Sequence, residues 1–213
     1  GSYVLSKLKV PNIAWLVEHP LCFHEKYLQS QGQRHFIFVN ESHAQFAAHL
    51  GLAGTFSTSL FGAEPQTIGK RHRNRHFDVC IAAQWRGPAS ANAFWLRQNK
   101  PTQDFFNDVI DLHDHEPNRD TFIAYVTAAA ARGWEDMRSL HTHVPAMRAL
   151  YWYMRKDERI RMVQALAASD LKVALIGGDT WRGVLPDNDN ITFLPACTHQ
   201  TLAEYYKDSK AVV

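Results

Sequence analysis

Four polar or glycine-rich segments of this sequence directly follow apolar runs. Two lie early in the chain, Glu18-His19 and Asn40-Glu41-Ser42, and two lie later, Gln84-Trp85-Arg86-Gly87 and Gly177-Gly178-Asp179-Thr180-Trp181-Arg182. Carboxylates and imidazoles in the first two can exchange a proton with a bound hydroxyl group. Arginine and glycine in the last two suit a phosphate, because a guanidinium offsets its charge and glycine allows close backbone approach. These four segments are the candidate functional sites.

Glu18 and His19 are the candidate catalytic residues, since either could act as the base toward an acceptor hydroxyl. Residues of the second segment compete for this role: Asn40, Glu41 and His43. Ser42 is better explained as a helix cap, because Ser42 and Gln45 together fit a capping box.

Paired histidines raise the question of a metal site. His113-x-His115 and His141-x-His143 each offer two ligands, but no cysteine or acid cluster completes either set at a usual spacing. Asp187-Asn188-Asp189-Asn190 precedes an apolar run and is typical of a turn. The sequence therefore predicts no metal site and no cofactor.

The apolar runs are predicted to be strands, because they are short and bounded by turn residues. They lie at 11–17, 36–39, 56–60, 77–83, 171–176 and 191–194, and another strand begins at 211. Helices are predicted between them from the spacing of apolar residues, at 22–30, 42–50, 89–98, 104–112, 120–132 and 145–169, with a short one that opens at 201 with a capping-box pattern.

Strands that alternate with helices indicate parallel sheets with crossover helices. An irregular stretch with Gly62, Pro65, Gly69 and several basic residues separates two such alternating runs. We therefore expect an α/β chain with two Rossmann-like parallel sheets. Residues 1–62 would belong to an amino-terminal domain, 63–76 to a linker and 77–213 to a carboxyl-terminal domain.

Composition narrows the class of protein. The formal net charge of +2 argues against a nucleic-acid surface, and no apolar run approaches the roughly 20 residues that span a bilayer. The first residues lack the basic and long apolar regions of a signal peptide. Three widely separated cysteines, Cys22, Cys80 and Cys197, make no disulfide framework. These features predict a cytoplasmic protein with reduced thiols, no membrane span and no nucleic-acid partner.

A set of motifs in order gives the sequence a family resemblance. The carboxyl half has Arg155-Lys156-Asp157-Glu158-Arg159 on a long helix, then the strand and glycines of 171–178, then Ile191-Thr192-Phe193-Leu194-Pro195, then 202–213. The amino half has a strand that ends in an acidic residue and a proline near 18–20, and later Gly62-Ala63-Glu64-Pro65. In this order the chain resembles bacterial glycosyltransferases of the GT-B type, and among them the spore-maturation CgeB-like group.

The resemblance implies two Rossmann-like domains that face a cleft. It also implies transfer of a sugar from a nucleotide-sugar donor to an acceptor hydroxyl on a glycan, protein or small molecule, without a metal. Arg86 and Gly87 would face the donor phosphates, with Arg86 contributing most to diphosphate binding. The other donor-binding candidates are Gly177, Gly178, Asp179, Trp181, Arg182, Phe193 and Leu194.

The resemblance does not include the family's first strands or the glycine-plus-glutamate helix that holds the donor. We therefore expect the chain to be incomplete at both ends. Segments 84–87 and 177–182 follow strands of one predicted sheet, so they are expected to line one pocket facing the first domain.

Two other functions stay open. One is a non-catalytic ligand-binding or scaffold module with the same fold. The other is a different doubly wound enzyme such as a nucleotide-sugar epimerase, which is disfavoured because no GxGxxG motif follows a predicted strand.

Overall fold

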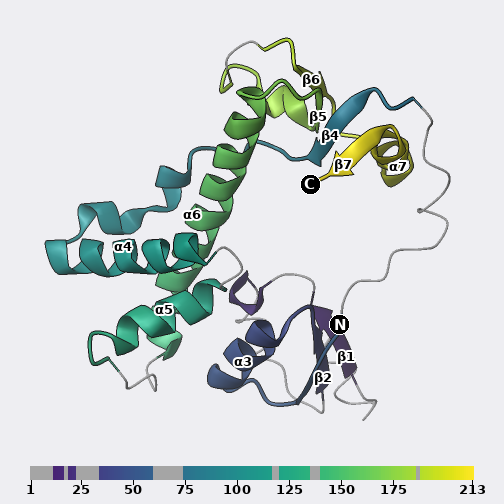
Figure 1. Cartoon of the computed structure of the whole chain (residues 1–213). Helices are drawn as coiled ribbons and strands as arrows, with labels where there is room; N and C mark the ends of the chain where they lie inside the picture. The colour runs from purple at the N-terminus through teal and green to yellow at the C-terminus, as the bar shows by residue number, and fades with distance from the viewer. Residues whose placement is uncertain are drawn as a thin grey trace. The chain divides into compact units, whose positions relative to one another are not determined.

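The computed structural model describes residues 12–16, 19–22, 34–59, 74–116, 120–134, 140–185 and 188–213 (Figure 1). These residues form an α/β structure with two parallel sheets, one of three strands and one of four, as predicted. The chain divides into two compact units. The first comprises Gly1–Phe61 and Asn92–Met154, and the second comprises Gly62–Ala91 and Arg155–Val213.

The two observed units do not have the same residue ranges as the two predicted domains. Residues 92–154, which were expected in the second domain, group with the first sheet. Only residues 74–76 of the expected linker are among those that the structure describes. The predicted boundary at 63–76 therefore stays a prediction.

The sheet of the first unit has the strand order β1-β2-β3, and both pairs of neighbours are parallel. Its strands are β1 (Asn12–Leu16), β2 (Arg34–Phe38) and β3 (Thr55–Thr58). Helix α3 (Glu41–His49) connects β2 to β3. Phe36 and Phe38 alternate with less buried residues along β2, and they lie in one core with Phe46 and Ala47 of α3.

The remaining elements that the structure describes in the first unit are helical. They are the 3₁₀ turns η1 (Pro20–Cys22) and η4 (Phe94–Arg97), the helices α4 (Lys100–His115) and α5 (Thr121–Ala130), and the first part of α6 (Leu140–Ala167). Helices α4 and α5 pack side by side (Figure 1). Their apolar residues join those of α3 and α6 in one core.

The second unit holds a sheet of order β6-β5-β4-β7, again parallel throughout. Its strands are β4 (Phe77–Ala82), β5 (Val173–Ile176), β6 (Ile191–Leu194) and β7 (Ser209–Val212). Side chains alternate between the two faces of these strands. Val163 and Ala167 of α6 pack on the face with Ile81 and Leu175.

Helix α7 (His199–Lys207) packs on the other face of this sheet. Its residues Leu202, Tyr205 and Tyr206 lie against Cys80 and Ala174. A parallel sheet with helices on both faces is the doubly wound architecture.

Several helix ends differ from their predicted positions. Asn40 rather than Ser42 caps α3, because its side chain accepts the His43 amide while Ser42 donates to Asn40. Thr198 caps α7, three residues before the predicted start. Helix α6 begins at Leu140, so Pro145 lies inside the helix rather than at its first turn.

The helix predicted at 89–98 is instead two 3₁₀ turns, η3 (Ala89–Asn92) and η4. Ala93 separates them with a backbone ψ of 63°, which no helix accommodates. In the described part of the chain, no helix has the length and apolar character needed to cross a bilayer. None of the three cysteines, all of which the structure describes, is in a disulfide bond.

Candidate functional site

The strand order of the second sheet marks one of its edges as the place for a ligand. In chain order the strands are arranged third, second, first, fourth, which is the order of half a doubly wound sheet. Such sheets bind ligands beyond the carboxyl ends of the strands where the order reverses, here between β4 and β7. Strand β4 ends at Ala82, so the segment with Arg86 begins at the reversal.

The segments that follow β4 and β5 lie against each other, as predicted from the topology. The amide of Trp85 donates to the Thr180 hydroxyl at 2.7 Å. The indole N–H of Trp181 donates to the carbonyl of Ala83 at 3.1 Å. The rings of Trp85 and Trp181 are 5.2 Å apart between centroids. The two loops therefore form one structure at the carboxyl edge.

Glycines give these loops their shape. Gly177 has a φ of +79°, a conformation that side chains disfavour, and a Cβ there would lie 3.2 Å from the Ala83 carbonyl oxygen. A Cβ on Gly178 would meet Phe193 at 3.0 Å. Gly87 has a φ of +83° but open space around its missing Cβ. The positive φ explains the first glycine of the pair, and close packing explains the second.

Arg86 lies close enough to α6 for its charge to act on an arginine of that helix. Partial burial lowers the pKa of Arg159 on α6, and the positive charges of Arg155 and Arg86 lower it further. Arg86 is exposed in its loop. Arg159 was noted only as part of a family motif, because its spacing along α6 says nothing about its distance from a loop seventy residues earlier.

Other predicted donor-binding residues have partners within the second unit. Asp179 and Arg182 form an exposed ion pair of 3.3 Å, and the guanidinium of Arg182 lies 5.1 Å from the centre of the Phe193 ring. Trp181 is only 1% exposed and packs in the core on the α6 side. Leu194 packs on the α7 side. Trp181 therefore joins loops and presents no open ring face.

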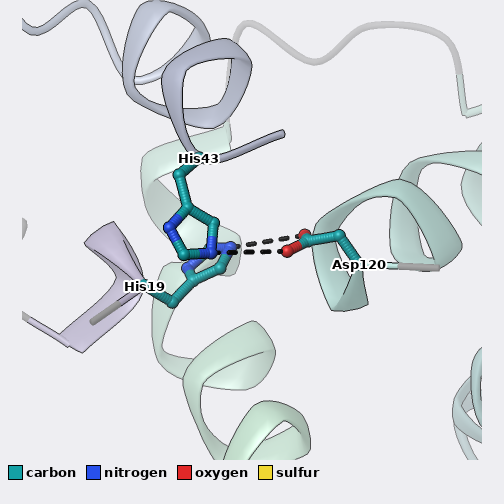
Figure 2. A group of neighbouring side chains, drawn as sticks. All are labelled: His19, His43 and Asp120. Carbon is teal, nitrogen blue, oxygen red and sulfur yellow. Dashed lines mark hydrogen bonds and ion pairs between the residues drawn. The ribbon is translucent and has the colours of Figure 1, made fainter. Parts of the chain in front are cut away.

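The carboxyl edge of the first sheet carries a second cluster. His19 follows β1, His43 lies in the first turns of α3 after β2, and Asp120 precedes α5. Figure 2 shows both imidazoles turned toward the Asp120 carboxylate. His19 Nε2 is 3.3 Å from Asp120 Oδ1, and His43 Nε2 is 3.7 Å from Asp120 Oδ2. Glu18, the other catalytic candidate, lies outside the described residues.

Each member of the cluster is held by its local structure. The His19 ring accepts the Leu21 amide at Nδ1, 3.1 Å away, at the start of η1. His43 belongs to the buried face of α3 with Phe46 and Ala47. Asp120 is the N-cap of α5 and accepts the Phe122 amide at 2.8 Å.

Neighbouring groups keep Asp120 ionised. Burial raises its pKa, but the hydrogen bond and positive charge of His19, the Phe122 amide and the positive charge of His43 together outweigh burial, and the pKa of Asp120 falls to about 2. The positive end of α5 acts in the same direction.

The three side chains of this cluster are of types that can bind a metal ion. The ligand atoms of His19, His43 and Asp120 lie within 4.8 Å of one another, and two histidines with a carboxylate can hold zinc or iron. However, Nδ1 of His19 accepts a backbone N–H. A neutral imidazole then carries its proton on Nε2, the atom that faces Asp120, and has no lone pair there for a metal. The observed bonds fit a hydrogen-bonded His–Asp pair.

His19 is therefore engaged at both ring nitrogens and is only 1% exposed. Its role as a base stays a prediction. His43 was a competing candidate, and Asp120 was only the first residue of a predicted helix. No sequence signal places this residue beside His19 and His43, which precede it by 101 and 77 positions.

Comparison of the chain with protein-family models, curated proteins and solved structures found no match.

Proposed function

We propose that the second unit binds the diphosphate of a nucleotide sugar at the carboxyl edge of β4 and β5, and that the protein is a glycosyltransferase. The observation that supports this most is the position of Arg86, in the loop at the strand reversal and near enough to Arg159 to lower the pKa of that guanidinium. Like charges gathered at one edge repel one another. A bound diphosphate would remove this repulsion and accept hydrogen bonds from the planar guanidinium groups.

The proposed reaction needs charge stabilisation at this edge. The oxygen of an acceptor hydroxyl bonds to the anomeric carbon of the donor sugar, while the bond from that carbon to the diphosphate oxygen breaks. The diphosphate leaves with the electron pair, and the hydroxyl proton passes to a base. Arg86 and Arg159 would stabilise the charge that develops on the departing oxygen.

Glu18 and His19 remain the proposed proton acceptors. For His19 to take a proton at Nδ1, it would have to release the Leu21 amide that it now accepts. The GT-B arrangement, in which the two sheets face a common cleft, is part of the same proposal. A nucleotide-binding module without catalysis would show the same affinity but no sugar transfer.

Calorimetric titration of the protein with UDP, GDP, ADP and dTDP tests the proposal. We expect at least one to bind, and Arg86→Ala to weaken that binding by roughly ten- to a hundredfold, the usual value of one charge-assisted contact. Arg97→Ala, which removes an exposed arginine of the first unit, should leave affinity unchanged. Binding of none of the four, or equal affinity for the wild type and Arg86→Ala, would contradict the proposal.

A further inference from the structure

The hydroxyl of Thr180 joins the two loops at the carboxyl edge of the second sheet. It accepts the backbone amide of Trp85 at 2.7 Å and donates to the carbonyl oxygen of Gly177 at 2.9 Å. One side chain from the β5 loop thus fixes the backbone of the β4 loop, at the residue directly before Arg86.

The other contacts between the loops involve earlier positions and the Trp85 ring, whose centroid lies 5.2 Å from that of the Trp181 ring. The Trp181 indole holds the Ala83 carbonyl, and the backbone of Gly177 packs closely on Ala83 and Gln84. These contacts anchor the base of the β4 loop. At Trp85 the hydrogen bond to Thr180 holds the backbone, and this bond is exposed to solvent.

The hydrogen bond from Trp85 to the Thr180 hydroxyl affects the orientation of Arg86. The direction of the Arg86 side chain depends on the backbone dihedrals of Trp85 and Arg86. A backbone that loses this hydrogen bond gains conformational freedom, and that freedom must be lost again when a ligand orders the arginine. A fixed backbone therefore presents the guanidinium ready for an anion.

We propose that Thr180 is a positioning residue for the phosphate site: its hydroxyl holds the Trp85 amide and thereby sets the position of Arg86. This inference rests on the proposed function, because it assigns Thr180 an effect on diphosphate affinity. Thr180 itself makes no contact with the ligand in this account. Its effect passes through the backbone of the β4 loop.

Two variants separate the hydroxyl from the shape of the side chain. Thr180→Val keeps the branched shape but removes donor and acceptor, whereas Thr180→Ser keeps the hydroxyl. Thr192→Val is the matched control, since it makes the same change at an exposed position of β6. Two measurements are made on each protein: hydrogen exchange of the Trp85 amide, and affinity for UDP or whichever nucleoside diphosphate binds the wild type best.

Thr180→Val is expected to speed exchange at the Trp85 amide and to weaken the affinity about fivefold, which corresponds to about 1 kcal/mol for one hydrogen bond. Thr180→Ser should restore both values, and Thr192→Val should change neither. Unchanged exchange in Thr180→Val would show that the bond does not hold the loop. Faster exchange with wild-type affinity would overturn the positioning role alone. If the wild type binds no nucleoside diphosphate, the proposed function fails first, and the positioning role fails with it.

Discussion

The carboxylate of Asp120 and the guanidinium of Arg86 differ in how neighbouring groups compensate their charges. Asp120 is 14% exposed at its side chain and accepts bonds from His19 and from the start of α5. Its charge is compensated inside the protein. Arg86 lies in an exposed loop, and the charges that it acts on include another cation, Arg159. The first arrangement is typical of a structural group, and the second supports the proposed anion site.

The charge of Asp120 makes a pH-dependent contribution to stability. Because its pKa is depressed from 3.8 to about 2 in the folded chain, the contribution is present above the unfolded value and is lost as the pH falls through about 2. A shift of this size corresponds to about 2 kcal/mol. Asp120→Asn should therefore lower the free energy of unfolding by about this amount at pH 7, and by much less near pH 2.

Asparagine is a matched replacement here, because it is also a good N-cap residue and keeps an oxygen for the Phe122 amide. Denaturant unfolding of both proteins between pH 7 and pH 2 measures the difference. A difference that stays constant over this range would mean that the carboxylate charge does not stabilise the fold.

Loops rather than strands give the second sheet its candidate site, and glycine makes their close approach possible. Gly177 follows β5 in a left-handed conformation, and a Cβ there would lie tightly against Ala83 and Gln84. Thr180 and Trp181 then reach the β4 loop within one 3₁₀ turn, η6 (Gly178–Trp181). The site therefore depends on a turn of a few residues between the strand and its return to the sheet.

Gly177→Ala is predicted to destabilise the protein by about 2 kcal/mol, since alanine at a positive φ costs about 1 kcal/mol and its Cβ also meets a backbone oxygen. Gly183→Ala provides the comparison. Gly183 has nearly the same φ, +80°, but nothing within 4 Å of its missing Cβ. Thermal or denaturant unfolding should show the larger loss for Gly177→Ala, and equal losses would argue against the close contact.

The sequence predicts the strands of this chain better than the ends of its helices. Buried runs such as 173–176 are short, apolar and followed by glycine, so a local pattern is enough to identify them. A cap depends on which of several polar side chains reaches a free amide. Backbone geometry selects Asn40 instead of Ser42 as the cap of α3, and Thr198 instead of Thr201 as the cap of α7. The residue types alone do not reveal this geometry.

The sequence likewise predicts some parts of the candidate sites and misses others. Topology places the loops after β4 and β5 together, because parallel strand ends share an edge. The parts that the sequence missed are those that come from distant elements: Arg159 on α6 and Asp120 before α5. Contacts between distant elements depend on how the helices pack on a sheet. The local pattern of a single sequence does not predict that packing.

Each of the two units follows one design. Both contain a parallel sheet, and in both the candidate functional residues lie at the carboxyl edge of the strands. The first edge has two histidines that lie against one carboxylate. The second has arginines and glycine loops. On this difference we base the central proposal, which is that the second unit binds an anion.

Mapping of backbone amide shifts during a UDP titration tests that claim most directly. The predicted result is a set of shifts at Gln84–Gly87 and Gly177–Arg182 that saturates with UDP, that the nucleoside uridine at the same concentrations does not reproduce, and that Arg86→Ala largely removes. Shifts confined to His19, His43 and Asp120, or equal shifts with uridine and UDP, would contradict a diphosphate site at the carboxyl edge of β4 and β5.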